Sequence, residues 1–242
     1  MKPIIKDALL RAGLYPIARS LYRKLSPLHR RQQALRTAFL AQLTKPGDLC
    51  FDVGGNLGQT VESLRACGAR VVTIEPNPAC LPTLRYSFGK DPQVVIVNKA
   101  VGAEPGVAML HCHGTSSTAS LRDGWWKTDD EVVETEVVTL GRLMDEHGPP
   151  QFMKVDVEGF EVAVFQGLDR PVPIITFEMH AAESAEAVAV LDRLSALGTI
   201  QGVNAVNEDH DRWLLDRWVP PSEFLTALGP PPNLANVVVR MG

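Results

Sequence analysis

The sequence has few cysteines and no long apolar run. Its four cysteines are widely spaced along 242 residues and form no Cys-x-x-Cys pair, so we expect reduced thiols in a cytoplasmic protein rather than a disulfide scaffold. No apolar stretch approaches the roughly 20 residues that cross a bilayer. Charges at Lys6, Asp7 and Arg11 interrupt the N-terminal apolar segment, which argues against a secretion signal.

Positive charge is scarce in most of the chain and concentrated at its start. Residues 1–45 hold ten Lys/Arg and one acid, giving +9, whereas the rest holds 14 Lys/Arg and 27 Asp/Glu, giving −13, which sums to the −4 of the whole chain. This acidic body and the lack of an aromatic-rich basic face argue against nucleic acid as a partner.

Apolar residues of the basic segment recur at helical spacing, three or four residues apart: Leu10, Leu14, Ile17, Leu21, Leu25 and Leu28. One interpretation is a helical cap that packs this stripe on the main domain. The alternative is an amphipathic arm for an anionic membrane surface, a lipid-linked substrate or an anionic glycan. A role in forming a homo-oligomer also stays open.

From residue 46 onward, short apolar segments alternate with helical ones. This order predicts an α/β domain over residues 46–242, with a mostly parallel central sheet and helices on both faces, preceded by the basic helical extension over residues 1–45. The expected strands are Leu49–Val53, Arg70–Glu75, Val94–Asn98, Phe152–Val157 and Ile174–Glu178. The expected helices are Thr60–Cys67, Ala79–Phe88, Glu161–Gly167 and Glu183–Leu197.

Two regions depart from the alternation. Val107–His113 and Val132–Leu140 are expected to pair as strands. Near the C-terminus, Trp213–Leu215 and Asn236–Met241 are strand-like pieces on either side of two proline clusters, and they are suited to antiparallel strands that close one side of the sheet.

The first strand ends in an acid and turns through glycines into a helix. Asp52 precedes Gly54, Gly55, Asn56 and Gly58, and such a turn is a place to bind a nucleotide-like ligand. An acid at the end of the next strand, Glu75, is suited to accept hydrogen bonds from ribose hydroxyls. Glycines in the turn would let the backbone approach the ligand closely.

The acid before the turn distinguishes between two candidate cofactors. A carboxylate at residue 52 would repel a pyrophosphate but attract the ammonium and sulfonium groups of S-adenosylmethionine. A Tyr-x-x-x-Lys spacing occurs at Tyr86 and Lys90, so this spacing does not exclude a nicotinamide site. The carboxylate of Asp52 is what favours S-adenosylmethionine over a nicotinamide dinucleotide.

A second polar group follows the fourth strand. Alternation places Lys154, Asp156 and Glu158 on one side of the extended chain. Burying these charges in a strand costs free energy unless they form ion pairs or contact a ligand. They either form a structural Lys154–Asp156 ion pair or face the reacting groups.

Two histidines compete with the carboxylates as the proton acceptor. His113 lies at the end of an expected strand, and His180 follows Glu178 at the end of another. The stretch His111-Cys112-His113 offers too few ligands to hold a metal ion by itself. A metal ion held by Asp156, Glu178 or His180 is a further alternative. A polar loop with adjacent aromatics is suited to a sugar acceptor and contains Ser116, Ser117, Trp125 and Trp126.

The motifs together resemble one family. Pro46–Asp48, the FDVGGNLGQT turn, IEPNP from Ile74, NKAVG from Asn98, KVDVEGFE from Lys154, and Phe177-Glu178 are similar, in this order, to the FkbM family of S-adenosylmethionine-dependent methyltransferases. The resemblance covers roughly residues 46–180. Gly55 departs from the alanine that is more frequent in the family, a small difference.

The resemblance implies a class I methyltransferase, Rossmann-like fold and O-methylation of a sugar, glycan or polyketide hydroxyl. It implies that Asp52, Gly54 and Asn56 line the methionine end of the cofactor, that Glu75 binds the ribose, and that Asn77 and Asn98, Lys99 and Ala100 approach the adenine. Asp156 and Glu158 would lie between cofactor and acceptor, with Lys154 and Glu178 on the acceptor side. A nicotinamide oxidoreductase and a non-catalytic binding module remain the alternatives.

Overall fold

The central sheet has seven strands in the order β10-β11-β9-β8-β1-β2-β3. This computed structural model describes residue 9 and residues 14–113, 119–122, 131–207, 209–210, 212–230 and 232–242. The parallel strands are β1 Leu49–Val53, β2 Arg70–Ile74, β3 Val94–Val97, β8 Phe152–Val155 and β9 Ile174–His180. Strands β10 Ile200–Asn207 and β11 Leu234–Met241 are antiparallel and complete one side.

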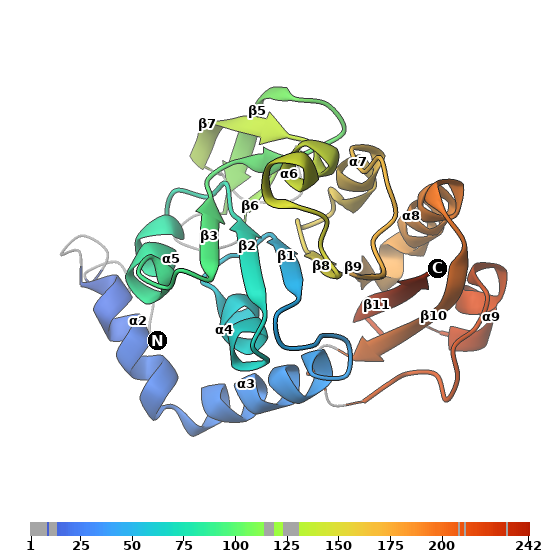
Figure 1. The fold of residues 1–242 in the computed structure, drawn as a ribbon, viewed down its shortest axis with the longest axis horizontal. Coiled ribbons are helices and arrows are strands. Elements are labelled where there is room, and N and C mark those ends of the chain that lie inside the picture. The colour runs from blue at the N-terminus through green and yellow to red at the C-terminus, as the bar shows by residue number, and fades with distance from the viewer. Residues whose placement is uncertain are drawn as a thin grey trace.

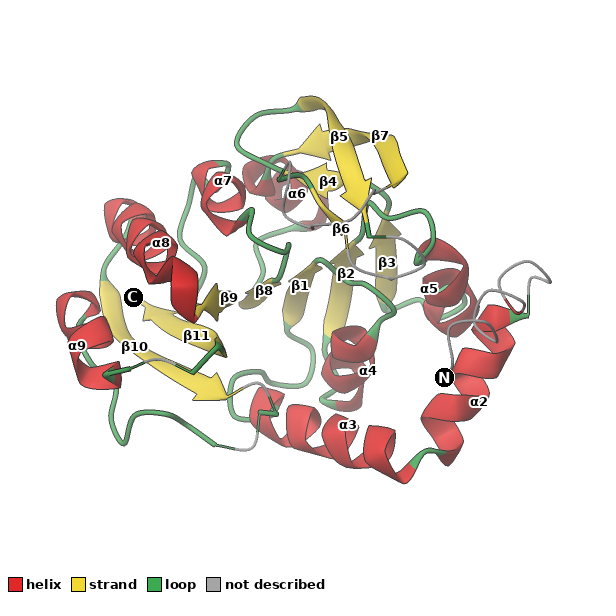
Figure 2. Ribbon diagram, turned by 180° about the vertical axis from the view of Figure 1, so that it is seen from behind, coloured by secondary structure: helices red, strands yellow, loops and turns green. Residues whose placement is uncertain are grey.

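Helices cover both faces of this sheet (Figures 1 and 2). Successive side chains of β1 point to opposite faces. Cys50 packs in a core with residues of α3 Pro27–Leu40, α4 Gln59–Ala66 and α5 Leu81–Phe88, whereas Phe51 packs in a core with α6 Leu140–His147, α7 Glu161–Gln166 and α8 Ser184–Leu197. The remaining α-helices of the described chain are α2 Tyr15–Leu25 and α9 Phe224–Leu228.

A smaller four-stranded sheet stands above the ends of β1, β2 and β3 (Figure 1). Its order is β4-β7-β5-β6, formed by Ala100–Val101, Glu131–Val138, Gly106–Cys112 and Ala119–Ser120. The antiparallel pairing of β5 with β7 confirms the expected strand pair.

The α/β class and the mostly parallel sheet are confirmed, with two differences at the C-terminal side. Strand β10, which the sequence analysis did not predict, lies at the edge of the sheet. The expected strand Trp213–Leu215 is wrong, since Trp213 forms only an isolated bridge to Val206. The apolar character of this segment serves side-chain packing and not strand pairing, because the Trp213 ring contacts the rings of Phe39 and Trp218. Within the described chain, no helix is both long and apolar enough to cross a membrane.

Candidate active site

A pocket opens at the carboxyl edge of the sheet, where the strand order changes direction. The chain runs outward from β1 to β2 and β3, then returns to β8 on the other side of β1, and ligands of open α/β sheets bind at such a switch point. The pocket spans about 600 Å³, a volume that includes the solvent at its open mouth. Its lining comes from both sheets and includes Gly54, Asn56, Glu75, Lys99, Ala100, Leu110, Ser120, Asp156, Glu158 and Phe160.

The glycine turn is shaped by neighbouring protein atoms. Gly54 has a φ of 84°, and a Cβ there would lie 1.7 Å from the carbonyl oxygen of Asp156. Gly58, at φ 83°, would place a Cβ 2.4 Å from the ring of Phe88. The expectation that the glycines chiefly make room for a ligand is therefore incomplete, because they first let β1 and α4 approach β8 and α5.

Glu75 holds the turn against the end of β2. Its Oε2 accepts a hydrogen bond from the backbone N–H of Asn56 at 2.6 Å, and its Oε1 accepts one from Asn77 N–H at 2.7 Å. Burial raises the pKa of Glu75 to about 7, against the lowering effect of these two bonds. Each carboxylate oxygen has a second lone pair, so Glu75 can still accept from a ligand hydroxyl in the pocket that it lines.

Asp52 lies fully buried behind the turn, outside the pocket lining. Its Oδ2 accepts from Thr73 Oγ1 at 3.4 Å, while its Oδ1 has no hydrogen-bond partner among the described residues. Burial raises the pKa of Asp52 to about 6, and the positive charges of Lys154 and Arg36 oppose this rise. Asp52 therefore acts on the pocket through its charge.

Arg36 was not anticipated from the sequence as part of this region. It belongs to α3 in the N-terminal extension, and burial lowers its pKa while Asp52 and Asp156 favour its charged form. The sequence places Arg36 in the basic segment but does not show that it lies near Asp52 and Asp156, because these residues are far apart in the chain.

Lys154 and Asp156 form an ion pair, with 2.6 Å between Nζ and Oδ2. The Lys154 side chain is only 10% exposed. Burial favours its neutral form, but Asp156, Asp52 and Glu178 outweigh that effect and raise its pKa. The structural role that the sequence left open is thus present, and Asp156 still lines the pocket.

Glu158, Glu178 and His180 meet beside this ion pair. One ligating atom of each lies within 4.8 Å of the others, and His180 Nε2 lies 3.1 Å from Glu178 Oε2. Burial, reinforced by the charges of Asp156 and Glu158, raises the pKa of Glu178 to about 9. Two carboxylates and an imidazole can hold either a proton or a divalent cation. This cluster replaces the Asp156, Glu178 and His180 grouping that the sequence suggested for a metal.

Residues expected near the adenine divide into two groups. Lys99 and Ala100 line the pocket, and Lys99 Nζ also pairs with Glu136 at 2.6 Å. Asn98 lies outside the lining and donates to the carbonyl oxygens of Glu75 and Pro76 at 3.0 and 3.2 Å. Asn77 is buried, with its Oδ1 accepting from the N–H of Ala79.

The expected acceptor residues are only partly placed. Ser116, Ser117, Trp125 and Trp126 lie outside the described residues, and His113, just after β5, is not in the pocket lining. Ser120, from the same polar segment, was not singled out as a site residue. It lines the pocket and donates from Oγ to the carbonyl oxygen of Glu158 at 2.8 Å.

The strand order, the pocket at the switch point and the acids at its rim define a class I methyltransferase fold. A TehB-like S-adenosylmethionine-dependent methyltransferase from Corynebacterium glutamicum has a similar structure, with a TM-score of 0.51, 10% identity and coverage of 100% of both chains. More particularly, the chain belongs to the FkbM methyltransferase family, whose domain model matches residues 52–215.

A curated relative is similar over most of its length. The hexuronic acid methyltransferase AglP of Haloferax volcanii is 27% identical over 200 residues, which cover 78% of this chain and 77% of AglP. Family and relative support S-adenosylmethionine-dependent methyl transfer as the class of reaction. They weigh against the nicotinamide alternative.

Proposed function

We propose that the protein methylates a hydroxyl group of a hexuronic acid or a related sugar, with S-adenosylmethionine as methyl donor. The observation that carries this proposal is the shared pocket of Glu75, Asp156 and Glu158, with the Glu178–His180 pair beside it. The name of the relative AglP supports the class of acceptor.

The pocket residues fit the donor. Glu75 has free lone pairs for ribose hydroxyls, and the pocket wall of Ile74, Pro76 and Val101 suits an adenine ring. The unpartnered Oδ1 of buried Asp52 and the carboxylate of Asp156 give the region negative charge, which favours a cationic ligand. When bound, S-adenosylmethionine supplies an electrophilic methyl group on a positively charged sulfur.

The acceptor hydroxyl must lose a proton as its oxygen is methylated, and a positioned base aids this step. We assign the base to His180, whose ring is oriented by the contact of its Nε2 atom with Glu178 Oε2 at 3.1 Å. Asp156 and Glu158 line the pocket between the donor residues and this pair, where they position the acceptor. Holding the reacting atoms in line contributes on the order of 7–11 kcal/mol.

A hydroxyl acceptor is favoured over the carboxylate of the hexuronic acid. A carboxylate needs no base, and it would approach the carboxylates of Asp156 and Glu158, which carry charge of the same sign. Methylation of a hydroxyl uses the His180 base and brings no negative charge to the reacting position.

The test is methyl transfer from radiolabelled S-adenosylmethionine to glucuronosides and galacturonosides, both free and lipid-linked, with the matching neutral hexosides as controls. We expect label in the uronosides that survives mild alkali, because a methyl ether resists hydrolysis whereas a methyl ester does not. Alkali-labile label would overturn hydroxyl methylation. Label in neutral hexosides alone would overturn the acceptor class.

A further inference from the structure

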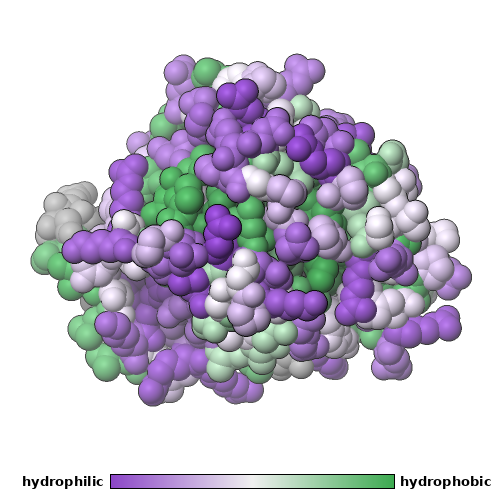
Figure 3. Space-filling view, viewed as in Figure 1, coloured by the Kyte–Doolittle hydropathy of each residue, from purple (hydrophilic) through white to green (hydrophobic). Residues whose placement is uncertain are grey.

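The apolar stripe of the N-terminal helices faces away from the rest of the protein. Its side chains are about half exposed or more: Leu14 49%, Ile17 51%, Leu21 56%, Leu25 65% and Leu28 60%. In Figure 3, hydrophobic side chains emerge at the lower left of the molecule, where Figure 1 shows α2. Leu10, the other member expected from the sequence, lies outside the described residues. The interpretation of the stripe as a cap packed on the main domain is therefore wrong for these residues.

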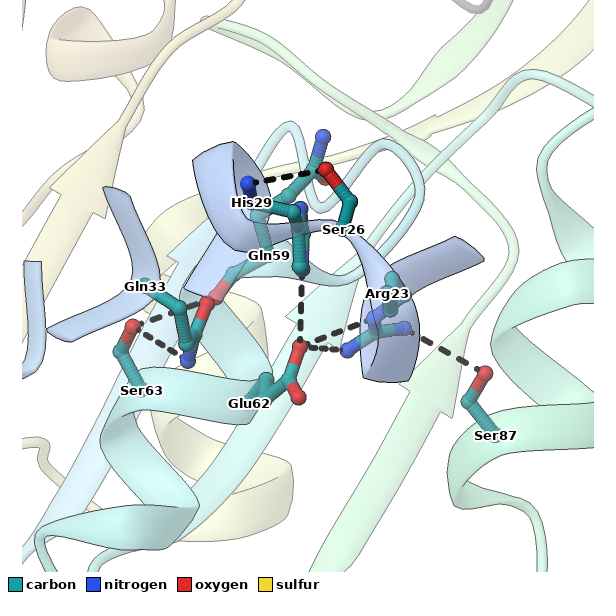
Figure 4. Close-up of polar contacts among 8 residues, drawn as sticks. All are labelled: Arg23, Ser26, His29, Gln33, Gln59, Glu62, Ser63 and Ser87. Carbon is teal, nitrogen blue, oxygen red and sulfur yellow. Dashed lines mark hydrogen bonds and ion pairs between the residues drawn. The ribbon is translucent and has the colours of Figure 1, made fainter. Parts of the chain in front are cut away.

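The opposite side of the same helices makes the contact with the domain. Tyr15 of α2 and Phe39 of α3 are buried there, and polar side chains add to the contact (Figure 4). The guanidinium group of Arg23 donates from Nε to Glu62 Oε2 at 2.8 Å and lies over the ring of Phe88, 5.5 Å from its centroid. On α3, Gln33 donates to Ser63 Oγ at 2.9 Å. Arg23 is only 8% exposed, so its side of α2 faces the domain. These contacts with α4 and α5 therefore hold the helices with their leucines outward.

Basic residues flank the outward stripe. Lys24, Arg30 and Arg31 are exposed, and the segment of residues 1–45 carries +9 in a chain of −4. An aliphatic stripe with cations beside it is the pattern of a helix that lies in the plane of a membrane surface. A symmetric dimer through this face would bring the same positive charges together, which disfavours a second copy of the chain as the occupant.

We propose that α2 and the start of α3 form a docking surface for an anionic lipid bilayer. The leucine stripe enters the boundary between headgroups and acyl chains, and the flanking Lys and Arg residues bind lipid phosphates. The stripe shares no residue with the pocket lining, so membrane docking does not depend on which acceptor is methylated.

The test is co-sedimentation of the full chain with phosphatidylcholine vesicles that contain or lack about 30% phosphatidylglycerol. We expect binding to the anionic vesicles, weakened by salt because exposed charges are screened. Leu21→Ser/Leu25→Ser should reduce that binding at least tenfold, since two exposed leucines no longer enter the bilayer. Lys24→Glu/Arg31→Glu should also reduce it.

The matched control is Val188→Ser, which replaces an exposed aliphatic residue, 41% exposed, on α8. It should bind vesicles like the parent protein, and thermal melting should show all variants folded. Absence of binding to anionic vesicles would overturn the proposal, as would equal binding by the leucine double variant. A vesicle-free dimer that the leucine variant converts to monomer would also overturn it, because a second copy would then occupy the stripe.

Discussion

The Nε2 atom of His180 lies 3.1 Å from the Oε2 atom of Glu178, at the end of the strand next to β8. The two residues share a face of β9 because they are two positions apart. Both lie at the carboxyl edge of the sheet, beside Asp156 and Glu158. We assign the proton acceptor of the proposed reaction to this pair.

Removing the imidazole should slow the reaction without weakening the donor complex. For His180→Ala we expect turnover to fall by about 10²–10⁴-fold, the usual contribution of a general base, with an unchanged Kd for S-adenosylhomocysteine in calorimetry. His147→Ala, in the last turn of α6, is the control and should be fully active. Glu75→Gln should give the opposite pattern, with binding weakened by about 1–3 kcal/mol. Full turnover in His180→Ala would refute the assignment.

The same cluster could hold a divalent cation, and chelation separates this from proton transfer. If His180 acts as a base, dialysis against EDTA should leave turnover unchanged. Loss of activity on dialysis, restored by Mg²⁺ or Mn²⁺, would instead assign Glu158, Glu178 and His180 as metal ligands.

Replacing Lys154 should lower the free energy of unfolding more than replacing Lys99, which is more exposed and forms an ion pair of the same length. Lys154→Met leaves Asp52 and Asp156 without their shared cation, and we expect the free energy of unfolding to fall by about 3–5 kcal/mol. Lys99→Met breaks an equally short pair with Glu136, whose side chain is 61% exposed, and should cost at most about 1 kcal/mol. Urea denaturation measures both. Similar small losses would show that the buried pair is not a stabilising element.

Gly55 and Thr73 should be energetically coupled. A Cβ at Gly55 would lie 1.9 Å from Thr73 Oγ1, so Gly55→Ala should destabilise the protein by about 1–3 kcal/mol through overpacking. Removing the hydroxyl with Thr73→Ala should relieve most of this cost, which a double-mutant cycle detects. Gly106→Ala is the control because nothing lies within 4 Å of its Cβ position. Additive losses would contradict the expected clash.

The ligand-free protein should lose stability as the pH rises from about 5 to 9. Burial raises the pKa values of Asp52 to about 6, of Glu75 and Glu161 to about 7 and of Glu178 to about 9. All four values exceed those of the unfolded chain, so the folded protein binds more protons, and the stabilisation present at low pH is lost as each group ionises. The slope is at most about 1.4 kcal/mol per group per pH unit.

Melting temperatures across this pH range test the prediction. Glu178→Gln should flatten the decline between pH 7 and 9, because the group with the highest pKa is then absent. A melting temperature that rises over the same interval would contradict it.

The sequence by itself determined the five parallel strands of the central sheet and the glycine turn after the first of them. Asp52, the glycines and Glu75 are local features at strand ends, and the strand alternation fixes which residues reach the carboxyl edge of a parallel sheet. Pocket residues from the small sheet, such as Leu110 and Ser120, could not be assigned, because their approach depends on how that sheet packs over β1 to β3.

Only the tertiary structure decided how the N-terminal helices face the domain. Helical periodicity predicts a stripe of leucines but is silent on which side of the helix meets a neighbour. Here the carboxylate of Glu62 on α4 pairs with Arg23, and this contact between residues 39 positions apart turns the leucines outward. The same long-range packing brings Arg36 near Asp52 and His180 near Glu158, since charge pairing between distant segments leaves no periodic signal in the sequence.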